Sequence, residues 1–157
     1  AQGFGLDIDW GDYPYVTSSH CTVAGAMLNG VPPKAVRNVW GVAKAYETYV
    51  GTKKFQGGDP IFDKICEVGQ EYGATTGRKR QVNWLDWDLV DKAIKVNGVT
   101  HLVFNKMDVL REVGTWKALE GGEVTQFWGE KDFQNFFYNN LSKSGISIYF
   151  SGDKARI

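Results

Sequence analysis

The feature that most constrains the fold is an alternation of amphipathic helix-like segments with short apolar strand-like segments. Helices are expected at residues 23–28, 61–72, 86–98 and 130–143, and strands at residues 39–43, 100–105 and 146–150. Asp86 or Asp88 can cap the third helix, and Gly98 is expected to end it. This order predicts an α/β fold with a mostly parallel sheet and flanking helices.

The first of these strands, residues 39–43, is apolar on both of its alternating sides. A strand that is buried on both faces of a sheet has this composition, so we expect cover on both sides. Residues 53–60 are polar and contain glycine, which indicates a loop.

Length and charge limit the classes of function. The chain has 157 residues, of which 43% are hydrophobic, and this suffices for one domain over residues 1–157. Eighteen basic residues balance eighteen acidic ones, so neither nucleic acid nor an anionic membrane is an expected partner. Two cysteines without secretory features favour reduced thiols and a cytoplasmic location.

The chain opens within a glycine-rich turn that normally follows a strand, so we expect further sequence upstream, in this chain or in a partner chain.

A four-residue motif, Asn105-Lys106-Met107-Asp108, directly follows an expected strand. A carboxylate at this place can accept from N1–H and the 2-amino group of guanine, while the lysine stem lies along the base. Ligands of open α/β sheets also lie at the carboxyl ends of strands. The alternative is an ordinary surface turn. A Ras-like GTPase would need a Gly-x-x-x-x-Gly-Lys-Ser/Thr phosphate loop, and the 157 residues contain none.

A second motif, at residues 73–80, places two glycines, two threonines and three cationic side chains in one short loop. Backbone N–H groups, hydroxyls and arginine forks in such a loop can bind carboxylate or phosphate. The alternative is a solvated basic turn.

Residues 7–19 form an acidic and hydroxyl-rich loop, which we interpret as facing a polar ligand. A metal site is not favoured, because a complete ligand set is not visible. His20 and His101 are expected to be packing or surface residues, and no Ser–His–Asp or Cys–His arrangement follows from the spacing.

Taken in order, these motifs resemble the adenylosuccinate synthetase family. The matching stretches are residues 1–3, 6–9, 13–19, 73–80 and 84–86, followed by the Lys-x-Asp of residues 106–108. The match is good over about residues 1 to 110 and poor beyond them. The resemblance implies the C-terminal portion of a fold of the P-loop type.

The resemblance also implies residue roles. Gln2 matches the glutamine that stabilises the 6-phosphoryl intermediate on IMP, and it is the catalytic residue expected here. The IMP-binding positions are Gln2, Thr17, Val50, Gly51 and Arg78. The aspartate-binding loop comprises Ala74, Thr75, Thr76, Gly77, Arg78, Lys79 and Arg80. The GTP-binding positions are Arg80, Lys106, Met107, Asp108, Ser151 and Gly152.

The activity implied is ligation of L-aspartate to IMP at the expense of GTP, giving adenylosuccinate in AMP biosynthesis. GTP phosphorylates the 6-oxygen of IMP, and the aspartate amine then displaces phosphate, with Mg²⁺ bridging the GTP phosphates. The Mg²⁺ ligands, the general base, the general acid and an arginine lent by the second subunit of a homodimer belong to segments outside this chain.

Several positions depart from the family pattern. Tyr49 stands where an arginine is usual, residues 52–55 replace a Gly-x-Gly-Pro-Phe pattern, and the end at residues 150–154 is one residue tighter. Two rival functions therefore remain open. One is the viral type of synthetase that acts on dGMP with ATP, and the other is a catalytically incompetent guanine-nucleotide-binding fragment.

Overall fold

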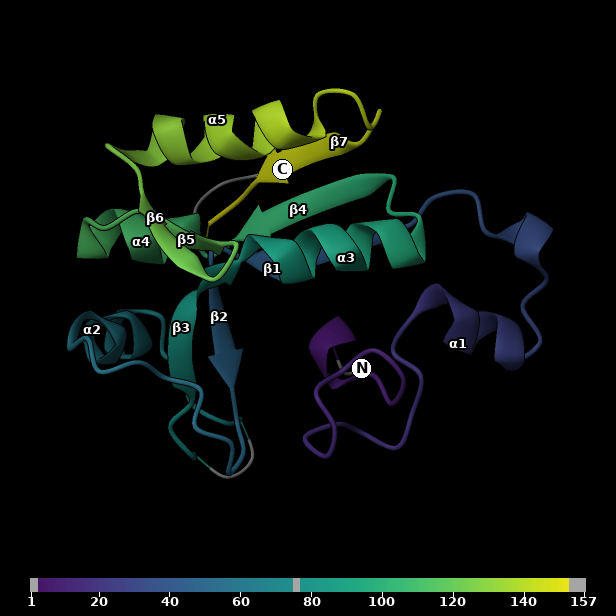
Figure 1. Cartoon of the computed structure of the whole chain (residues 1–157), viewed down its shortest axis with the longest axis horizontal. Helices are drawn as coiled ribbons and strands as arrows, with labels where there is room; N and C mark the ends of the chain where they lie inside the picture. The colour runs from purple at the N-terminus through teal and green to yellow at the C-terminus, as the bar shows by residue number, and fades with distance from the viewer. Residues whose placement is uncertain (1–2, 75–76, 153–157) are drawn as a thin grey trace.

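The computed structural model describes residues 3–74 and 77–152 (Figure 1). The elements comprise two short 3₁₀ helices, five α-helices and seven strands within those residues. The 3₁₀ helices are Phe4–Leu6 and Pro33–Ala35, and the α-helices are α1 (Val23–Leu28), α2 (Ile61–Val68), α3 (Trp87–Asn97), α4 (Met107–Val113) and α5 (Glu130–Leu141). The strands are β1 (Trp40–Lys44), β2 (Tyr46–Tyr49), β3 (Gln81–Asp86), β4 (His101–Asn105), β5 (Lys117–Glu120), β6 (Glu123–Gln126) and β7 (Ser147–Phe150).

Three strands form a parallel sheet in the order β1-β4-β7. In its register Lys44, the last residue of β1, lies opposite Asn105, the last residue of β4. The carboxyl ends of these strands therefore meet at one edge of the sheet, where open α/β folds bind ligands. The predicted α/β class with a mostly parallel sheet is confirmed.

A second sheet has the order β2-β3-β5-β6 and is of mixed direction. β2 and β3 are antiparallel, β3 and β5 are parallel, and β5 and β6 form an antiparallel hairpin. The elements β2, β3, β5, β6 and α4 were not predicted from the sequence. The strands in this group are short and include polar residues, so their pairing partners rather than an apolar run stabilise them.

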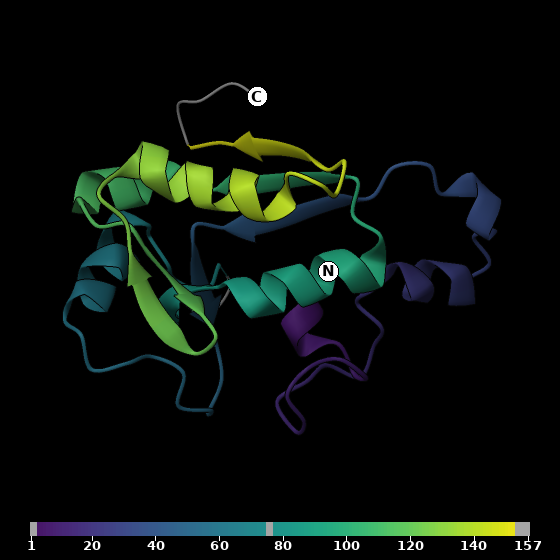
Figure 2. The same ribbon diagram turned by 45° about the horizontal axis from the view of Figure 1, so that its top comes forward.

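Aromatic side chains of α5 form part of the core. Figure 2 shows α5 lying against the three-stranded sheet. Phe133 and Phe137 are both fully buried, and the Phe137 ring centroid lies 4.3 Å from that of Phe104 on β4. Trp87 on α3 meets Phe137 edge to face at 5.5 Å. The packing of α5 and α3 thus covers one face of the sheet.

The opposite face of β1 is open. Trp40 and Val42 are 52% and 67% exposed, although the apolar run of this strand predicted cover on both sides. That prediction is wrong for this structure, because α3 and α5 pack on the face that carries Leu102 and Phe104. On the open face, Trp40 instead stacks on His101, with 4.3 Å between the ring centroids.

The predicted caps of α3 are confirmed. Asp86 is the N-cap and accepts a hydrogen bond from the Leu89 N–H at 3.1 Å, and Gly98 ends the helix at φ 60°. The helix predicted for residues 61–72 ends earlier, at Val68. A side chain at Gly69 would collide with the Tyr46 hydroxyl, and Gln70 then adopts φ 52°.

This early end of α2 turns the chain so that Glu71 points into the protein interior, where its side chain is 2% exposed.

The N-terminal segment packs beside α3. The Val23 N–H donates to the Asn97 side chain at 2.9 Å, and Lys92 lies over the Trp10 ring at 5.3 Å from its centroid. None of the helices in the described ranges has both the length and the hydropathy that crossing a membrane demands.

We expect Phe137→Ala to lower the free energy of unfolding by about 3–5 kcal/mol, because it removes a fully buried ring and leaves a cavity. Guanidinium denaturation followed by circular dichroism measures this change. Trp128→Ala is the matched control, since the Trp128 side chain is fully exposed and should tolerate truncation. Equal effects of the two substitutions would contradict this account of the core.

Candidate functional site

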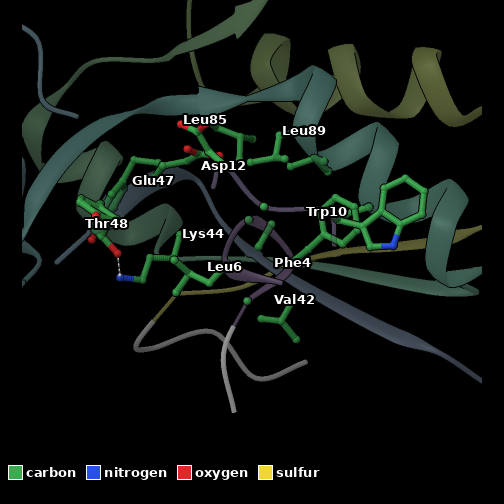
Figure 3. A pocket seen from close by; sticks show the side chains of 18 of the residues that line it. Phe4, Leu6, Trp10, Asp12, Val42, Lys44, Glu47, Thr48, Leu85 and Leu89 are labelled. Carbon is green, nitrogen blue, oxygen red and sulfur yellow. Dashed lines mark hydrogen bonds between the residues drawn. The ribbon is translucent and has the colours of Figure 1, made fainter. Parts of the chain in front are cut away.

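A large cavity of about 950 Å³ opens between the N-terminal segment, α3 and the β1–β2 region (Figure 3). Phe4, Leu6 and Trp10 line it from the N-terminal segment. Leu89 and its neighbours line it from α3. The charged and hydroxyl-bearing residues on its wall are Asp12, Lys44, Glu47, Thr48, Lys53 and Arg80, together with Tyr15, Tyr46 and Tyr49. The cavity therefore combines apolar surface with a few polar groups, as ligand pockets do.

The buried carboxylate of Glu71 organises one wall of this cavity. Lys44 Nζ donates to Glu71 Oε1 at 2.7 Å, and the Tyr46 hydroxyl donates to the same oxygen at 2.8 Å. Arg80 Nη1 donates to Glu71 Oε2 at 2.8 Å. One carboxylate thus holds two cations that line the cavity, and its own burial is offset by three hydrogen bonds.

The same contacts shift the pKa values of Glu71 and Tyr46. Burial alone would raise the pKa of Glu71, but the hydrogen bonds from Lys44 and Tyr46 and the positive charges of Lys44 and Arg80 outweigh it, so the pKa is lowered. Burial, and then the hydrogen bond to Glu71, raise the pKa of the Tyr46 hydroxyl. Glu71 is therefore an anion and Tyr46 a neutral donor at neutral pH.

Glu47, on the same cavity wall, has a different environment. Burial and the nearby negative charge of Asp86 raise the pKa of Glu47 to about 7. A carboxyl group whose pKa lies near neutrality can exchange a proton under physiological conditions. Glu47 was not predicted from the sequence, because the four-residue strand that carries it has no recognisable motif.

The basic loop at residues 73–80 is placed only in part. Thr75 and Thr76 lie outside the described residues. Arg80 lines the large cavity, whereas Lys79 pairs with Asp63 at 2.7 Å on the surface. Ala74, Gly77 and Arg78 are exposed and line neither cavity.

A second, smaller cavity of about 260 Å³ lies at the carboxyl end of β4. Its lining residues are Asn105, Lys106, Asp108, Ser151 and Gly152. Asn105 Oδ1 and Asp108 Oδ1 are both buried and have no hydrogen-bond partner among residues 3–74 and 77–152. Buried acceptors of this kind are costly unless a ligand or water supplies donors.

Two backbone hydrogen bonds and the close approach of Gly152 fix the backbone around the small cavity. The Met107 N–H donates to Ser151 O at 3.2 Å, and the Ser151 N–H donates to Phe104 O at 2.8 Å. A side chain at Gly152 would come within 2.9 Å of the Asp108 carboxylate, so this approach requires glycine. Met107 itself is buried in the core.

The lysine of the motif adopts a left-handed conformation, with φ 62° at Lys106. Its Nζ donates to the Gly69 carbonyl at 3.1 Å, so its stem crosses from β4 to the end of α2. This contact joins the small cavity to the segment that carries Glu71.

The remaining predicted positions are scattered. Gln2 lies outside the described residues. Val50 lines the large cavity, while Gly51 is exposed beside it and Thr17 is half-buried in the N-terminal segment. Thr17 donates its N–H to Leu6 O at 2.8 Å. Of the predicted residues, Val50 and Arg80 line the large cavity, Lys106, Asp108, Ser151 and Gly152 line the small one, and the Glu71 network lies between the two cavities.

One cluster of three possible metal ligands occurs within the described ranges, namely Asp7, Asp9 and His20. The Asp7 carboxylate is fully buried and accepts backbone hydrogen bonds from Asp9, Trp10 and Cys21. These bonds outweigh burial and lower the pKa of Asp7. Since they occupy both carboxylate oxygens, Asp7 stabilises the loop, and the cluster does not fit Mg²⁺, which prefers several free oxygen ligands.

Comparison with known proteins identifies the family. The sequence profile described as adenylosuccinate synthetase matches residues 1–126. The chain belongs to the adenylosuccinate synthetase family. Adenylosuccinate synthetases from Caenorhabditis elegans and Christiangramia forsetii are 48% and 45% identical to it over 126 and 135 residues.

The two matches cover 77% and 80% of this chain but 27% and 31% of those relatives. The chain therefore spans about a third or less of their length.

One solved structure supports the same family, and a second shows the same fold. The fully ligated adenylosuccinate synthetase of Plasmodium falciparum superposes with a TM-score of 0.81 at 26% identity, covering 97% of this chain and 46% of that one. The succinoaminodeoxyadenylate synthetase of cyanophage S-2L, bound to dGMP and dATP, gives a TM-score of 0.54 at 21% identity. That match covers 88% of this chain and 48% of the phage protein, and it shows a shared fold alone.

The pKa of Glu47 predicts a pH-dependent stability. Folding raises this pKa from 4.5 to about 7, so the folded chain binds more protons than the unfolded chain in that window, and stability falls as pH rises through it. Glu47→Gln should remove this loss of folding stability at higher pH, because glutamine does not ionise. We expect the variant to be more stable than the parent by up to about 3 kcal/mol at about pH 8, with little difference near pH 4.

Urea denaturation at the two pH values measures this effect. Glu123→Gln is the matched control, because Glu123 is exposed on β6. A stability difference for Glu47→Gln that does not change with pH would contradict the assignment.

Proposed function

We propose that this chain provides the guanine-recognition and amino-acid-recognition parts of a GTP-dependent ligase that joins L-aspartate to IMP. The product is adenylosuccinate, and the intermediate is 6-phosphoryl-IMP. Because the chain spans about a third or less of its curated relatives, the complete reaction also needs the remaining family sequence, in the same or another chain. The observation that carries the proposal is the buried, unpartnered Oδ1 of Asp108 in the small cavity.

Guanine fits the donor and acceptor pattern of the small cavity. The base presents N1–H and the 2-amino group on one edge, and a carboxylate can accept from both. The Asp108 oxygen lacks a donor from the rest of the described chain, which leaves it available for that role. Adenine lacks this pair of donors, so it would leave the buried acceptor unpaired at a cost of about 1–3 kcal/mol.

The end of β7 supports the same assignment. Ser151 and Gly152 line the small cavity opposite Asp108, and Gly152 is the residue that permits the close approach. Lys106 is tethered to Gly69, which holds its stem at the cavity wall. We assign Lys106, Met107, Asp108, Ser151 and Gly152 to GTP, with Met107 contributing backbone and core packing.

The large cavity suits the other two substrates. Arg80, oriented by Glu71, offers a guanidinium fork to a carboxylate or phosphate. Val50 and Gly51 lie where a nucleotide ribose could contact backbone, and the proposed aspartate loop ends at Arg80. Donors of this kind stabilise the negative charge that develops on oxygen as phosphate is transferred and then displaced.

Mg²⁺ and a homodimer belong to this proposal as features of the complete enzyme. Mg²⁺ would neutralise charge on the GTP phosphates, and its ligands would come from family sequence outside this chain, because the Asp7 cluster does not fit it. Cys21 and Cys66 are both free thiols, which agrees with a reducing compartment such as the cytoplasm.

Replacing Asp108 tests the guanine assignment. We expect the parent chain to bind GTP more tightly than ITP, which lacks the 2-amino group, and ITP more tightly than ATP. Asp108→Asn should weaken GTP binding about 10- to 100-fold. It should also improve binding of XTP, because the new amide can donate to the 2-oxygen of xanthine. Isothermal titration calorimetry with the four nucleotides measures these changes.

Asp91→Asn is the matched control, since Asp91 pairs with Lys95 on α3, away from the small cavity. A GTP preference that survives Asp108→Asn would show that Asp108 does not read the base.

The viral-type rival is tested by activity. The chain is combined with the remaining sequence of a family enzyme, supplied as a second polypeptide, and turnover of IMP with GTP is compared with turnover of dGMP with ATP. Turnover of dGMP with ATP alone would contradict the proposed substrates and favour the viral type of synthetase. Guanine-nucleotide binding without turnover of either pair would favour the catalytically incompetent fragment.

A further inference from the structure

Lys44 is a cation on the wall of the large cavity that the residue assignments above do not use. It is the last residue of β1, and its register partner Asn105 lies in the small cavity. Lys44 therefore stands at the carboxyl edge of the parallel sheet, between the two candidate sites. Side chains at such an edge are in position to meet a ligand.

Two hydrogen bonds hold the Lys44 side chain in place, and one N–H donor of its ammonium group remains unused within the described residues. Its Nζ donates to Glu71 Oε1 at 2.7 Å and to Thr48 Oγ1 at 2.9 Å. An ammonium group has three N–H donors, so one is left for a ligand. Arg80 Nη1 uses one of the guanidinium donors on Glu71 Oε2, and the fork has four more.

The local charge balance favours an anion. Lys44 and Arg80 carry two positive charges and Glu71 carries one negative charge, which leaves a surplus of one positive charge at this wall. The other charged groups on the cavity wall cancel it only in part. Asp12 pairs with Lys53, and Glu47 is partly protonated near neutral pH.

From this arrangement we infer that Lys44 and Arg80 form a paired oxyanion-binding subsite, with Glu71 as the residue that positions both. The ligand is a carboxylate or phosphate oxygen that enters the large cavity and takes the free N–H donors of the two cations. The inference rests on the proposed function for the anion-binding role of Arg80 and for the choice of L-aspartate as a test ligand, and it adds Lys44 to that site. It assigns to Lys44 a direct contact with substrate and to Glu71 an indirect, positioning role.

The electrostatics of Lys44 agree with this role. Burial lowers the pKa of Lys44, and the charges of Arg80 and Lys106 lower it further, while Glu71 opposes the change. A bound anion would favour the charged form and raise the pKa again. Ligand binding and the protonation of Lys44 are therefore linked.

Calorimetric titration of the whole chain with L-aspartate and with inorganic phosphate tests the subsite and separates the two ligand classes. We expect at least one of them to bind, and Lys44→Met to weaken that binding about tenfold or more, since a charge-assisted hydrogen bond is lost. Lys44→Arg should retain most of the affinity, because it keeps the charge. Lys34→Met is the matched control, since Lys34 is exposed and lines neither cavity.

A spectroscopic measurement on the unsubstituted chain covers the case in which Lys44→Met fails to fold. With ¹³C-labelled lysine, the pKa of Lys44 is followed by NMR with and without the ligand, and we expect the ligand to raise it. Unchanged affinity in a folded Lys44→Met variant, an unchanged Lys44 pKa, or the failure of both ligands to bind would each overturn the inference.

Failure of the subsite and failure of the proposed function are distinguishable. Guanine discrimination by Asp108 depends on the small cavity and is measured with GTP and ITP. If that discrimination persists while Lys44 is insensitive to L-aspartate and phosphate, the subsite alone is wrong.

Discussion

The candidate site depends on the buried carboxylate of Glu71. It joins the end of β1, through Lys44, to the start of β3, through Arg80, and it also takes the Tyr46 hydroxyl. Removing one partner of such a buried group typically costs about 3–5 kcal/mol, so the four side chains are held as a unit. Because both cations line the large cavity, the interaction that stabilises this junction also determines the charge of the cavity wall.

The parallel register of β1, β4 and β7 brings the two cavities to the same edge. Lys44 and Asn105 are register partners, and the segment after β7 closes the small cavity at Ser151 and Gly152. Parallel strands necessarily end together when the register is in phase, so ligand-binding side chains from distant parts of the chain become neighbours. Ligands bound in the two cavities would then lie on either side of the Glu71 network.

Patterns of neighbouring residues predicted the three strands of the parallel sheet and the helices α1, α2, α3 and α5. They did not predict the short strands of the second sheet, which depend on pairing with neighbouring strands. The caps of α3 at Asp86 and Gly98 were predicted from the sequence, because N-cap and C-cap chemistry is local. The second sheet was missed, since its short strands have no apolar run of their own. For the site, Lys106 and Asp108 were predicted by a motif, whereas Glu71 has no local pattern, and its role appears when α2 ends early at Val68.

The amino-acid sequence by itself determined the α/β class, the family resemblance and the residue types of the motif at residues 105–108. These follow from periodicity, capping and ordered short motifs, which are properties of neighbouring residues. Only the tertiary structure decided that Arg80 and Asp108 line two different cavities, that Asp108 has a buried oxygen without a partner in the described chain, and that Lys44 and Arg80 share one carboxylate. The physical reason is that burial, charge pairing and cavity shape arise from contacts between segments far apart in the chain. The spacing of residues along the sequence does not show which distant segments will be in contact.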